Sequence, residues 1–167
     1  KRAIMFFRGT SDPEDYIDDT NVTWAHWGPS ERGAIVFGGF LEHIHRGGVG
    51  DKLVEIAKNL PTTVTDLIIC GHSLGAAASV LVTAAVSEAL PMRFQTTVIL
   101  VGAPRAGNAA FVKILAEQKN VRIWRVVNHN DPITRIAWWT PRPAFYRHPF
   151  STTLWINRKE AILIPAG

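Results

Sequence analysis

The chain has 167 residues, of which 47% are hydrophobic and 19% charged. This excludes a disordered or low-complexity protein and leaves room for one globular domain, over residues 1–167. The formal net charge is +4, with 7 Lys and Arg against 10 Asp and Glu in residues 1–83 and 11 against 4 in residues 84–167. A basic half suits anionic surfaces or nucleic acid, but no basic helix or run of like charge accompanies it. We therefore expect a solvated surface and no nucleic-acid partner.

The longest apolar stretch and the single cysteine both point to an ordinary packed core. Residues 74–86 are apolar apart from Ser79 and Thr83, and they are fewer than the roughly 20 residues that span a bilayer. Cys70 has no partner for an internal disulfide and ends an apolar run, which favours a buried thiol. The residues carry no signal-peptide pattern and do not fix a cellular location.

Short apolar runs and helical periodicity alternate in the first part of the chain. Residues 3–7 are continuously apolar, which is typical of a strand buried on both faces, and residues 34–37 form a second such run. Residues 12–19 carry five acidic residues and a proline, and they predict a loop or a short surface helix. Residues 50–60 space their apolar positions as a helix does, up to Pro61.

The second part of the chain alternates more regularly. The pattern predicts a strand over 64–70, a buried helix over 76–90, a strand over 96–101, a helix over 108–117 and strands over 121–127, 152–156 and 161–164. The last two strands suit an antiparallel hairpin around Asn157 and Arg158. Alternating strands and helices imply a largely parallel sheet that is covered on both sides.

A Gly-His-Ser-Leu-Gly sequence at residues 71–75 joins a predicted strand to a predicted helix. The pentapeptide pattern alone arises by chance in about one chain in twenty of this length. Its context is more specific, because a strained strand-to-helix turn exposes Ser73 as a nucleophile and needs glycine on both sides. A serine that only caps a helix needs neither glycine. The Leu74 N–H then faces a developing oxyanion at the helix N-terminus.

A serine hydroxyl attacks only when a base takes its proton and a carboxylate orients that base. In hydrolases with this strand-to-helix turn, the chain order is serine, acid, histidine. Asp131 is the one aspartate after Ser73 and directly follows the predicted strand 121–127. His129 is two residues from Asp131 on the same loop, so chain order and reach favour His148 as the base.

Five motifs occur in an order that resembles one family. They are Phe-Arg-Gly-Thr at 7–10, Gly-Phe-Leu at 39–41, Gly-His-Ser-Leu-Gly at 71–75, Gly-Ala-Pro-Arg-Ala-Gly-Asn at 102–108 and Val-Asn-His-Asn-Asp-Pro-Ile at 127–133. From about residue 4 to residue 155 the chain resembles the fungal-type class 3 lipases of the α/β-hydrolase superfamily. The resemblance implies an α/β-hydrolase fold, with a mostly parallel central sheet flanked by helices.

The resemblance also assigns roles that the residues alone do not. It implies that Thr10 supplies the second oxyanion donor and that a mobile lid covers about residues 12–20, where Tyr16 replaces a family tryptophan. Tyr146-Arg147-His148 is similar to the family's histidine segment. No metal or organic cofactor is implied, and the family leans toward secretion.

Two departures from the family pattern are visible. The chain starts at a strand that is internal in the family, and Asp131 precedes His148 by fewer residues than in the secreted fungal members. We therefore expect a pared-down version or a fragment, which lacks the family's N-terminal helix.

Aromatic residues crowd the approach to His148. Such side chains bind an acyl chain or enter a lipid interface, although ordinary core packing explains them equally well. The candidates for substrate contact are Tyr16, His72, Trp138 and Trp139. His72 is next to the nucleophile, and we expect its side chain to point away. His43 and His45 lack a nearby third ligand, so no metal site is expected.

Two functions follow from this reading. The first is hydrolysis of lipid-like carboxylic esters through a Ser-His-Asp acyl-enzyme, as a triacylglycerol lipase or a related esterase with transient contact to a lipid interface. The second is a catalytically silent lipid-binding or scaffold protein that keeps the fold. The three triad residues argue for the first. The sequence predicts neither the acyl chain length nor the oligomeric state.

Overall fold

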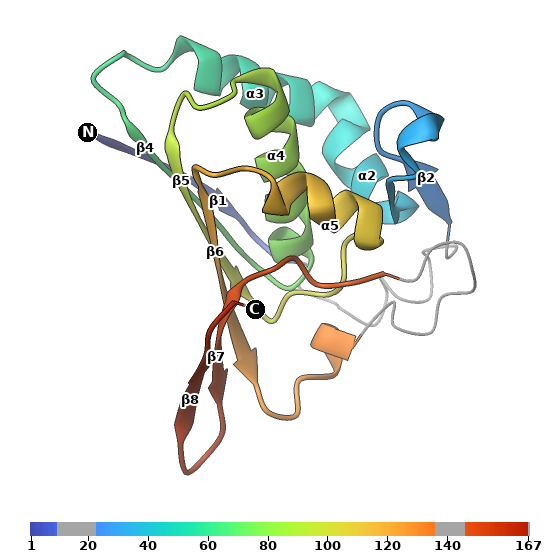
Figure 1. Cartoon of the computed structure of the whole chain (residues 1–167), viewed down its shortest axis with the longest axis vertical. Coiled ribbons are helices and arrows are strands. Elements are labelled where there is room, and N and C mark those ends of the chain that lie inside the picture. The colour runs from blue at the N-terminus through green and yellow to red at the C-terminus, as the bar shows by residue number, and fades with distance from the viewer. Residues whose placement is uncertain (10–22, 136–145, 167) are drawn as a thin grey trace.

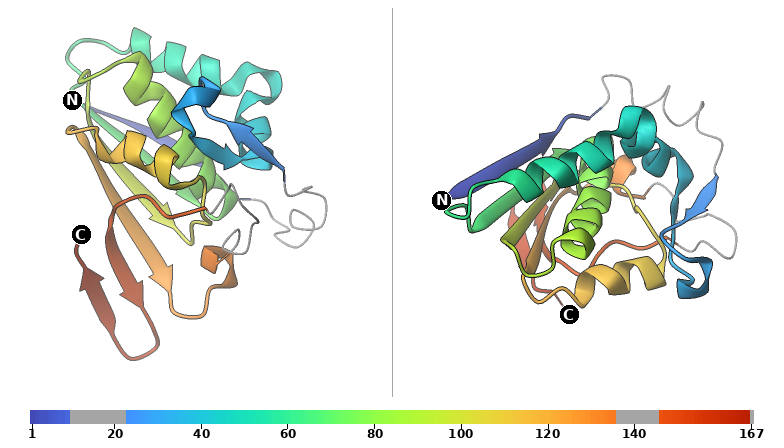
Figure 2. Two further views of the ribbon diagram at one scale, coloured as in Figure 1. Left: turned by 45° about the vertical axis from the view of Figure 1, so that its right-hand side comes forward. Right: turned by 90° about the horizontal axis from the view of Figure 1, so that it is seen from above.

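The centre of the molecule is a six-stranded sheet. The computed structural model describes residues 1–9, 23–135 and 146–166. The strands of the sheet are β1 (Arg2–Phe7), β4 (Asp66–His72), β5 (Gln95–Val101), β6 (Val121–Asn128), β7 (Thr152–Ile156) and β8 (Ala161–Ile164), in the order β1-β4-β5-β6-β7-β8. All neighbouring pairs are parallel except β7 and β8, which form the predicted antiparallel hairpin. The hairpin extends beyond the helices, as the left view in Figure 2 shows.

The helices gather on one side of this sheet (Figure 1). They are α2 (Gly38–His45), α3 (Val49–Asn59), α4 (Leu74–Ala89) and α5 (Ala109–Ala116), with short 3-10 turns η1 (Ser30–Arg32), η2 (Arg46–Gly48) and η3 (Pro132–Arg135). The central helix α4 is buried along almost its whole length, because it packs on β4 and β5 and is covered in turn by α2 and α3. No helix in the described ranges is long and apolar enough to cross a membrane.

The expectation that helices cover both faces of the sheet is wrong for the described residues. Burial alternates along β1, where Met5 faces the helices and is buried, whereas Ile4 and Phe6 are each 68% exposed. The reason lies in the strand order. From β1 to β7 each new strand is added at the same edge, and right-handed crossovers then place every connecting helix on the same face.

The predicted strands and the helices α3, α4 and α5 are all present, with boundaries that shift by a few residues. The sequence patterns missed α2 and the short strand β2 (Trp24–His26), which pairs antiparallel with β3 (Ile35–Phe37). Helix α2 begins with Gly38 and Gly39, which disfavour helices. It is held by tertiary contacts instead, because Gly38 N–H donates to the Thr23 carbonyl over 2.8 Å and Phe40 and Ile44 are buried.

Candidate active site

Ser73 occupies the sharp turn between β4 and α4. Its backbone angles, φ 54° and ψ −124°, lie in a region that non-glycine residues rarely adopt. Two backbone hydrogen bonds hold this conformation: Ser73 N–H donates to the Val101 carbonyl over 2.9 Å, and the Ser73 carbonyl accepts from Ala76 N–H over 2.9 Å. The serine is therefore fixed where β4 and β5 end and α4 begins.

The two flanking glycines are required by close backbone contacts. A Cβ atom on Gly71 would lie 2.3 Å from the Gly75 carbonyl oxygen, and one on Gly75 would lie 2.2 Å from the Phe7 carbonyl oxygen. Both distances are far below van der Waals contact, and in each case the obstacle is backbone. The predicted reason for the two glycines, close packing of strand and helix at the turn, is thus confirmed.

Leu74 is the first residue of α4, and its side chain is buried. The first N–H groups of a helix have no acceptor within the helix, and they lie at the positive end of its dipole. The Leu74 N–H is placed directly beside Ser73, where such a group stabilises an oxyanion. Its role as a donor stays a prediction.

Asp131 reaches the same edge of the sheet from the loop after β6. Its N–H donates to the Asn128 carbonyl over 2.9 Å, and its Oδ1 accepts from Ile133 N–H over 3.0 Å. Its Oδ2 lies 2.7 Å from the position that a Cβ atom of Gly102 would occupy. Gly102 has φ 57° and directly follows Val101, the residue that accepts from Ser73. The structure thus brings Asp131 and Ser73 to neighbouring strand ends.

His72 is exposed at this edge, between the ends of β1 and β5. Its Nδ1 lies 3.2 Å from the Cβ position of Gly9, and its Nε2 lies 3.8 Å from that of Gly102. The imidazole and the Asp131 carboxylate therefore both flank Gly102. The proposed contact of His72 with substrate stays a prediction.

Among the described residues, His148 is hydrogen-bonded to neither Asp131 nor Ser73, and its role as the base stays a prediction. Its Nε2 lies 2.9 Å from the Thr134 carbonyl oxygen and donates to it, because a carbonyl only accepts. Its Nδ1 is buried without a hydrogen-bond partner among the described residues. Burial and the Arg125 guanidinium, with a smaller contribution from Arg105, lower the pKa of His148 to about 3, although the bond to Thr134 opposes this.

The reason for this placement is the anchoring of the segment that carries His148. Arg147 N–H donates to the Gly107 carbonyl over 2.6 Å, and the buried Tyr146 hydroxyl donates to the Val36 carbonyl over 3.1 Å. These contacts hold residues 146–148 between the loop after β5 and β3. His129, the alternative base, packs edge-on against Trp155, with the two ring centroids 4.7 Å apart.

Two arginines near His148 were missed by the sequence reasoning. Arg125 lies in β6, and burial lowers its pKa to about 10 with a further contribution from Arg105. The sequence feature that could have revealed Arg125 is its charge within a predicted strand that is otherwise largely apolar. Arg105 lies within the Gly-Ala-Pro-Arg motif, which was used only for the resemblance.

The remaining predicted site residues lie outside the described ranges. They are Thr10, Tyr16, Trp138 and Trp139. Within the described ranges, no three histidine, cysteine or acidic side chains gather in a way that suits a metal ion.

Comparison with known proteins decides the family. The sequence profile of the family described as Lipase (class 3) matches residues 4–140, which is most of the chain. The chain belongs to the class 3 lipase family. Phospholipase A(1) DAD1, a chloroplastic protein of Arabidopsis thaliana, is 30% identical to this class 3 lipase chain over 149 residues, which cover 80% of the chain and 33% of the relative. Secreted mono- and diacylglycerol lipase 3 of Gibberella zeae is 30% identical over 128 residues, which cover 75% of this chain and 38% of that relative.

Solved lipase structures share the fold. The lipase from Rhizopus microsporus var. chinensis superposes with a TM-score of 0.76 at 26% identity, covering 96% of this chain and 55% of that one. A triacylglycerol lipase from Penicillium expansum gives a TM-score of 0.78 at 18% identity, covering 98% and 63%. The predicted α/β-hydrolase fold of the class 3 lipase type is thus confirmed. The chain spans between a third and two fifths of the length of the curated relatives it matches.

Proposed function

We propose that this domain is a serine hydrolase that cleaves carboxylic esters of lipids. The observation that carries the proposal is the strained conformation of Ser73, with φ 54°, at the start of a buried helix. Such strain persists only where the surrounding structure enforces it, and here two glycines and two backbone hydrogen bonds do so. A serine that served only to cap α4 would need no such arrangement.

The proposed reaction is an acyl transfer in two steps. The Ser73 Oγ attacks the ester carbonyl while a general base takes its proton, and the Leu74 N–H stabilises the oxyanion. The base then gives the proton to the departing alcohol, and water hydrolyses the acyl-enzyme by the same path in reverse. Asp131 orients the base, because its carboxylate lies at the same edge of the sheet. Thr10 supplies the second oxyanion donor by analogy with the family.

The proposed substrates are fatty acyl esters of glycerol. The similar proteins are named as a phospholipase A(1) and as a mono- and diacylglycerol lipase, and these substrates have an acyl–glycerol ester bond in common. The sequence carries a cluster of aromatic residues before His148, Trp138 and Trp139 among them, and such side chains suit contact with a lipid interface.

The test is covalent labelling of the folded protein with a fluorophosphonate probe. We expect the wild type to be labelled and Ser73→Ala not to be labelled, and we expect hydrolysis of p-nitrophenyl esters to fall by at least about a thousandfold in that variant. A series of acyl chain lengths, with and without an emulsion, then defines the substrate. Short esters cleaved faster than long ones under both conditions would contradict a lipid substrate.

A second candidate function is a silent lipid-binding protein. It is favoured by one observation, that none of the histidines in the described ranges is hydrogen-bonded to the Asp131 carboxylate. Without an oriented base, Ser73 would be unreactive. A folded wild type that resists the fluorophosphonate probe while it still binds lipid vesicles would establish this function and overturn the first.

A further inference from the structure

A cavity of about 530 Å³ lies between the start of α5 and residues 146–150, away from Ser73. Three of its lining side chains are basic and three are apolar: Arg105, Arg147 and His148, and Ala109, Val112 and Phe150. Neither Ser73, Leu74 nor the Asp131 carboxylate lines it. It is thus a site separate from the proposed catalytic one.

The arginines at or near this cavity have no counter-charge among the described residues. Within the part of the chain that the structure describes, Arg105, Arg125 and Arg147 form no ion pair. Arg125 Nε and His148 Nδ1 are also buried without a hydrogen-bond partner there. Burial and mutual repulsion lower the pKa of both Arg105 and Arg125. Buried cations without a counter-charge are costly, so this arrangement suits an anion that would pair with the guanidinium groups.

The basic groups are held in place by backbone contacts. Arg147 is bridged to Gly107 through the 2.6 Å hydrogen bond, and Gly107 is bridged in turn to Val36 of β3. His148 is fixed by its bond to Thr134. Two separate segments, the loop after β5 and residues 146–148, therefore present positive charge to the cavity, and Arg125 of β6 lies close to His148.

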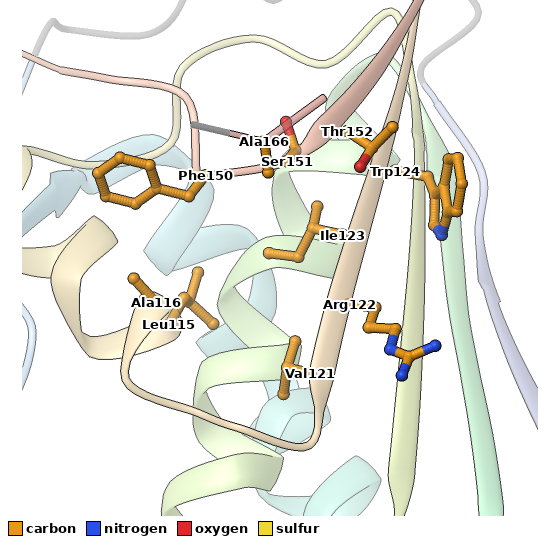
Figure 3. A pocket seen from close by; sticks show the side chains of 10 residues that line it. All are labelled: Leu115, Ala116, Val121, Arg122, Ile123, Trp124, Phe150, Ser151, Thr152 and Ala166. Atoms are coloured by element: carbon orange, nitrogen blue, oxygen red, sulfur yellow. The ribbon is translucent and has the colours of Figure 1, made fainter. Parts of the chain in front are cut away.

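A second cavity of about 510 Å³, lined mainly by apolar side chains but also by Arg122, Ser151 and Thr152, lies between α5 and β6. Phe150 lines both cavities. In Figure 3, Val121 and Ile123 point from β6 toward Leu115 on α5, whereas Arg122 and Trp124 point to the other side of the strand. A ligand with its charged end at the arginines thus has an apolar path beside it.

We propose that the two cavities together bind a fatty acid, with its carboxylate between Arg105, Arg147 and His148 and its acyl chain along α5 past Phe150. Arginine forks match carboxylates in a bidentate manner. The site also touches the catalytic loop, because His148 binds the Thr134 carbonyl and Thr134 Oγ1 donates to the Asp131 carbonyl over 2.9 Å.

The test measures binding without turnover, in the Ser73→Ala variant, so that its outcome is independent of the proposed hydrolase function. Isothermal titration with sodium decanoate below its micelle concentration should show one saturable site per chain. Decanol and decyltrimethylammonium should not bind, and acetate and inorganic phosphate should bind at least about tenfold more weakly because they lack the acyl chain. Inorganic phosphate that binds as tightly as decanoate would overturn the acyl part of the proposal, and tighter binding of decyl phosphate would overturn the choice of a carboxylate.

Side-chain substitutions then locate the site. Arg105→Gln and Arg147→Gln should each weaken decanoate binding by about tenfold, which corresponds to the loss of one charge-assisted hydrogen bond. Phe150→Ser should weaken decanoate but not acetate. Arg158→Gln is the matched control, because Arg158 lies in the exposed turn between β7 and β8 and lines neither cavity, and it should bind decanoate as before. Each variant is checked for an unchanged circular dichroism spectrum. Unchanged affinity in Arg105→Gln and Arg147→Gln, or an equal loss in Arg158→Gln, would overturn the proposal.

Discussion

The turn at Ser73 and the segment around His148 were both expected to belong to one catalytic triad, but the two regions differ in what holds them. At Ser73, two glycines, the end of β1 and the start of α4 meet in contacts that leave no space for a Cβ atom. At His148, the imidazole is turned to the Thr134 carbonyl and toward arginines, and the Asp131 carboxylate binds its own loop instead. The nucleophile is fixed by its surroundings, whereas the expected acid–base pair is not formed.

This difference separates predictions that rest on a local motif from predictions that rest on contacts between distant segments. The serine turn is built from five consecutive residues, whose sterics hold wherever the motif joins a strand to a helix. The pairing of Asp131 with a histidine depends on how distant segments cross. Here the segment that carries His148 is anchored to Gly107 and Val36.

The largest expected effect separates Asp131 from His148 in catalysis. Asp131→Asn should lower kcat/KM for a p-nitrophenyl ester by about 10³- to 10⁴-fold, because a neutral amide no longer orients and stabilises the base. His148→Gln should lower it by less than about tenfold, because a glutamine amide still donates to the Thr134 carbonyl. Equal losses in the two variants would restore His148 to the triad.

The next effect concerns the packing at Ser73. Gly75→Ala should lower the free energy of unfolding by about 3 kcal/mol or more, because its Cβ would strike the backbone of Phe7 and Arg8. Gly33→Ala is the control, since Gly33 has open space around it and its only obstacle to alanine is its positive φ of 61°. That variant should lose only about 1 kcal/mol. Urea denaturation measures both, and similar losses would mean that the contacts at Gly75 are not decisive.

A smaller effect is the pH dependence caused by His148. Its pKa is about 3 in the folded protein against a usual value of 6.5, so unfolding allows it to take up a proton between these values. The stabilisation that its neutral form provides is complete above pH 6.5 and is lost as the pH falls toward 3. From pH 7 to pH 5 this amounts to about 1–2 kcal/mol. Unfolding midpoints should therefore fall less over this range in His148→Gln, and parallel curves would contradict the inferred environment.

The smallest effect tests the link between the two regions. Thr134→Val removes the hydroxyl that donates to the Asp131 carbonyl and should lower stability by about 1 kcal/mol. Thr97→Val, in β5, removes a hydroxyl for which the structure shows no such bond and serves as the control. If Thr134→Val and Thr97→Val lower the midpoint of thermal unfolding equally, the hydrogen bond from Thr134 to the Asp131 carbonyl does not stabilise the η3 turn.

Much of the fold could be predicted from the sequence. Apolar runs and helical spacing gave the strands of the main sheet and the helices α3 to α5, because their periodicity reflects burial directly. Helix α2 escaped prediction because it begins with two glycines and owes its stability to buried Phe40 and Ile44. The exposed face of the sheet also escaped it, since Ile4 and Phe6 look like core residues in a strand pattern, and only the strand order shows that no described helix covers them.

The site was predicted in part. Ser73, Leu74 and Asp131 lie together because each follows the end of a strand or begins the adjoining helix, and parallel strands bring such ends to one edge. The position of His148 depends on the contacts of Tyr146 and Arg147 with segments far away in sequence, which no local pattern encodes. The charged cluster at Arg105 and Arg125 was missed for the same reason.

The contact of Gly75 with the carbonyl of Phe7 has a consequence for the order in which the protein assembles. Among the described strands β1 lies at the edge of the sheet and pairs with β4 alone, so it can dock after the other strands have formed. Until β1 docks, Gly75 at the start of α4 lacks its contact with the Phe7 carbonyl, and this contact helps to hold Ser73 in its strained conformation. During refolding, fluorophosphonate labelling of Ser73 should therefore appear later than helix content. The time at which labelling appears would then report when the edge strand β1 docks.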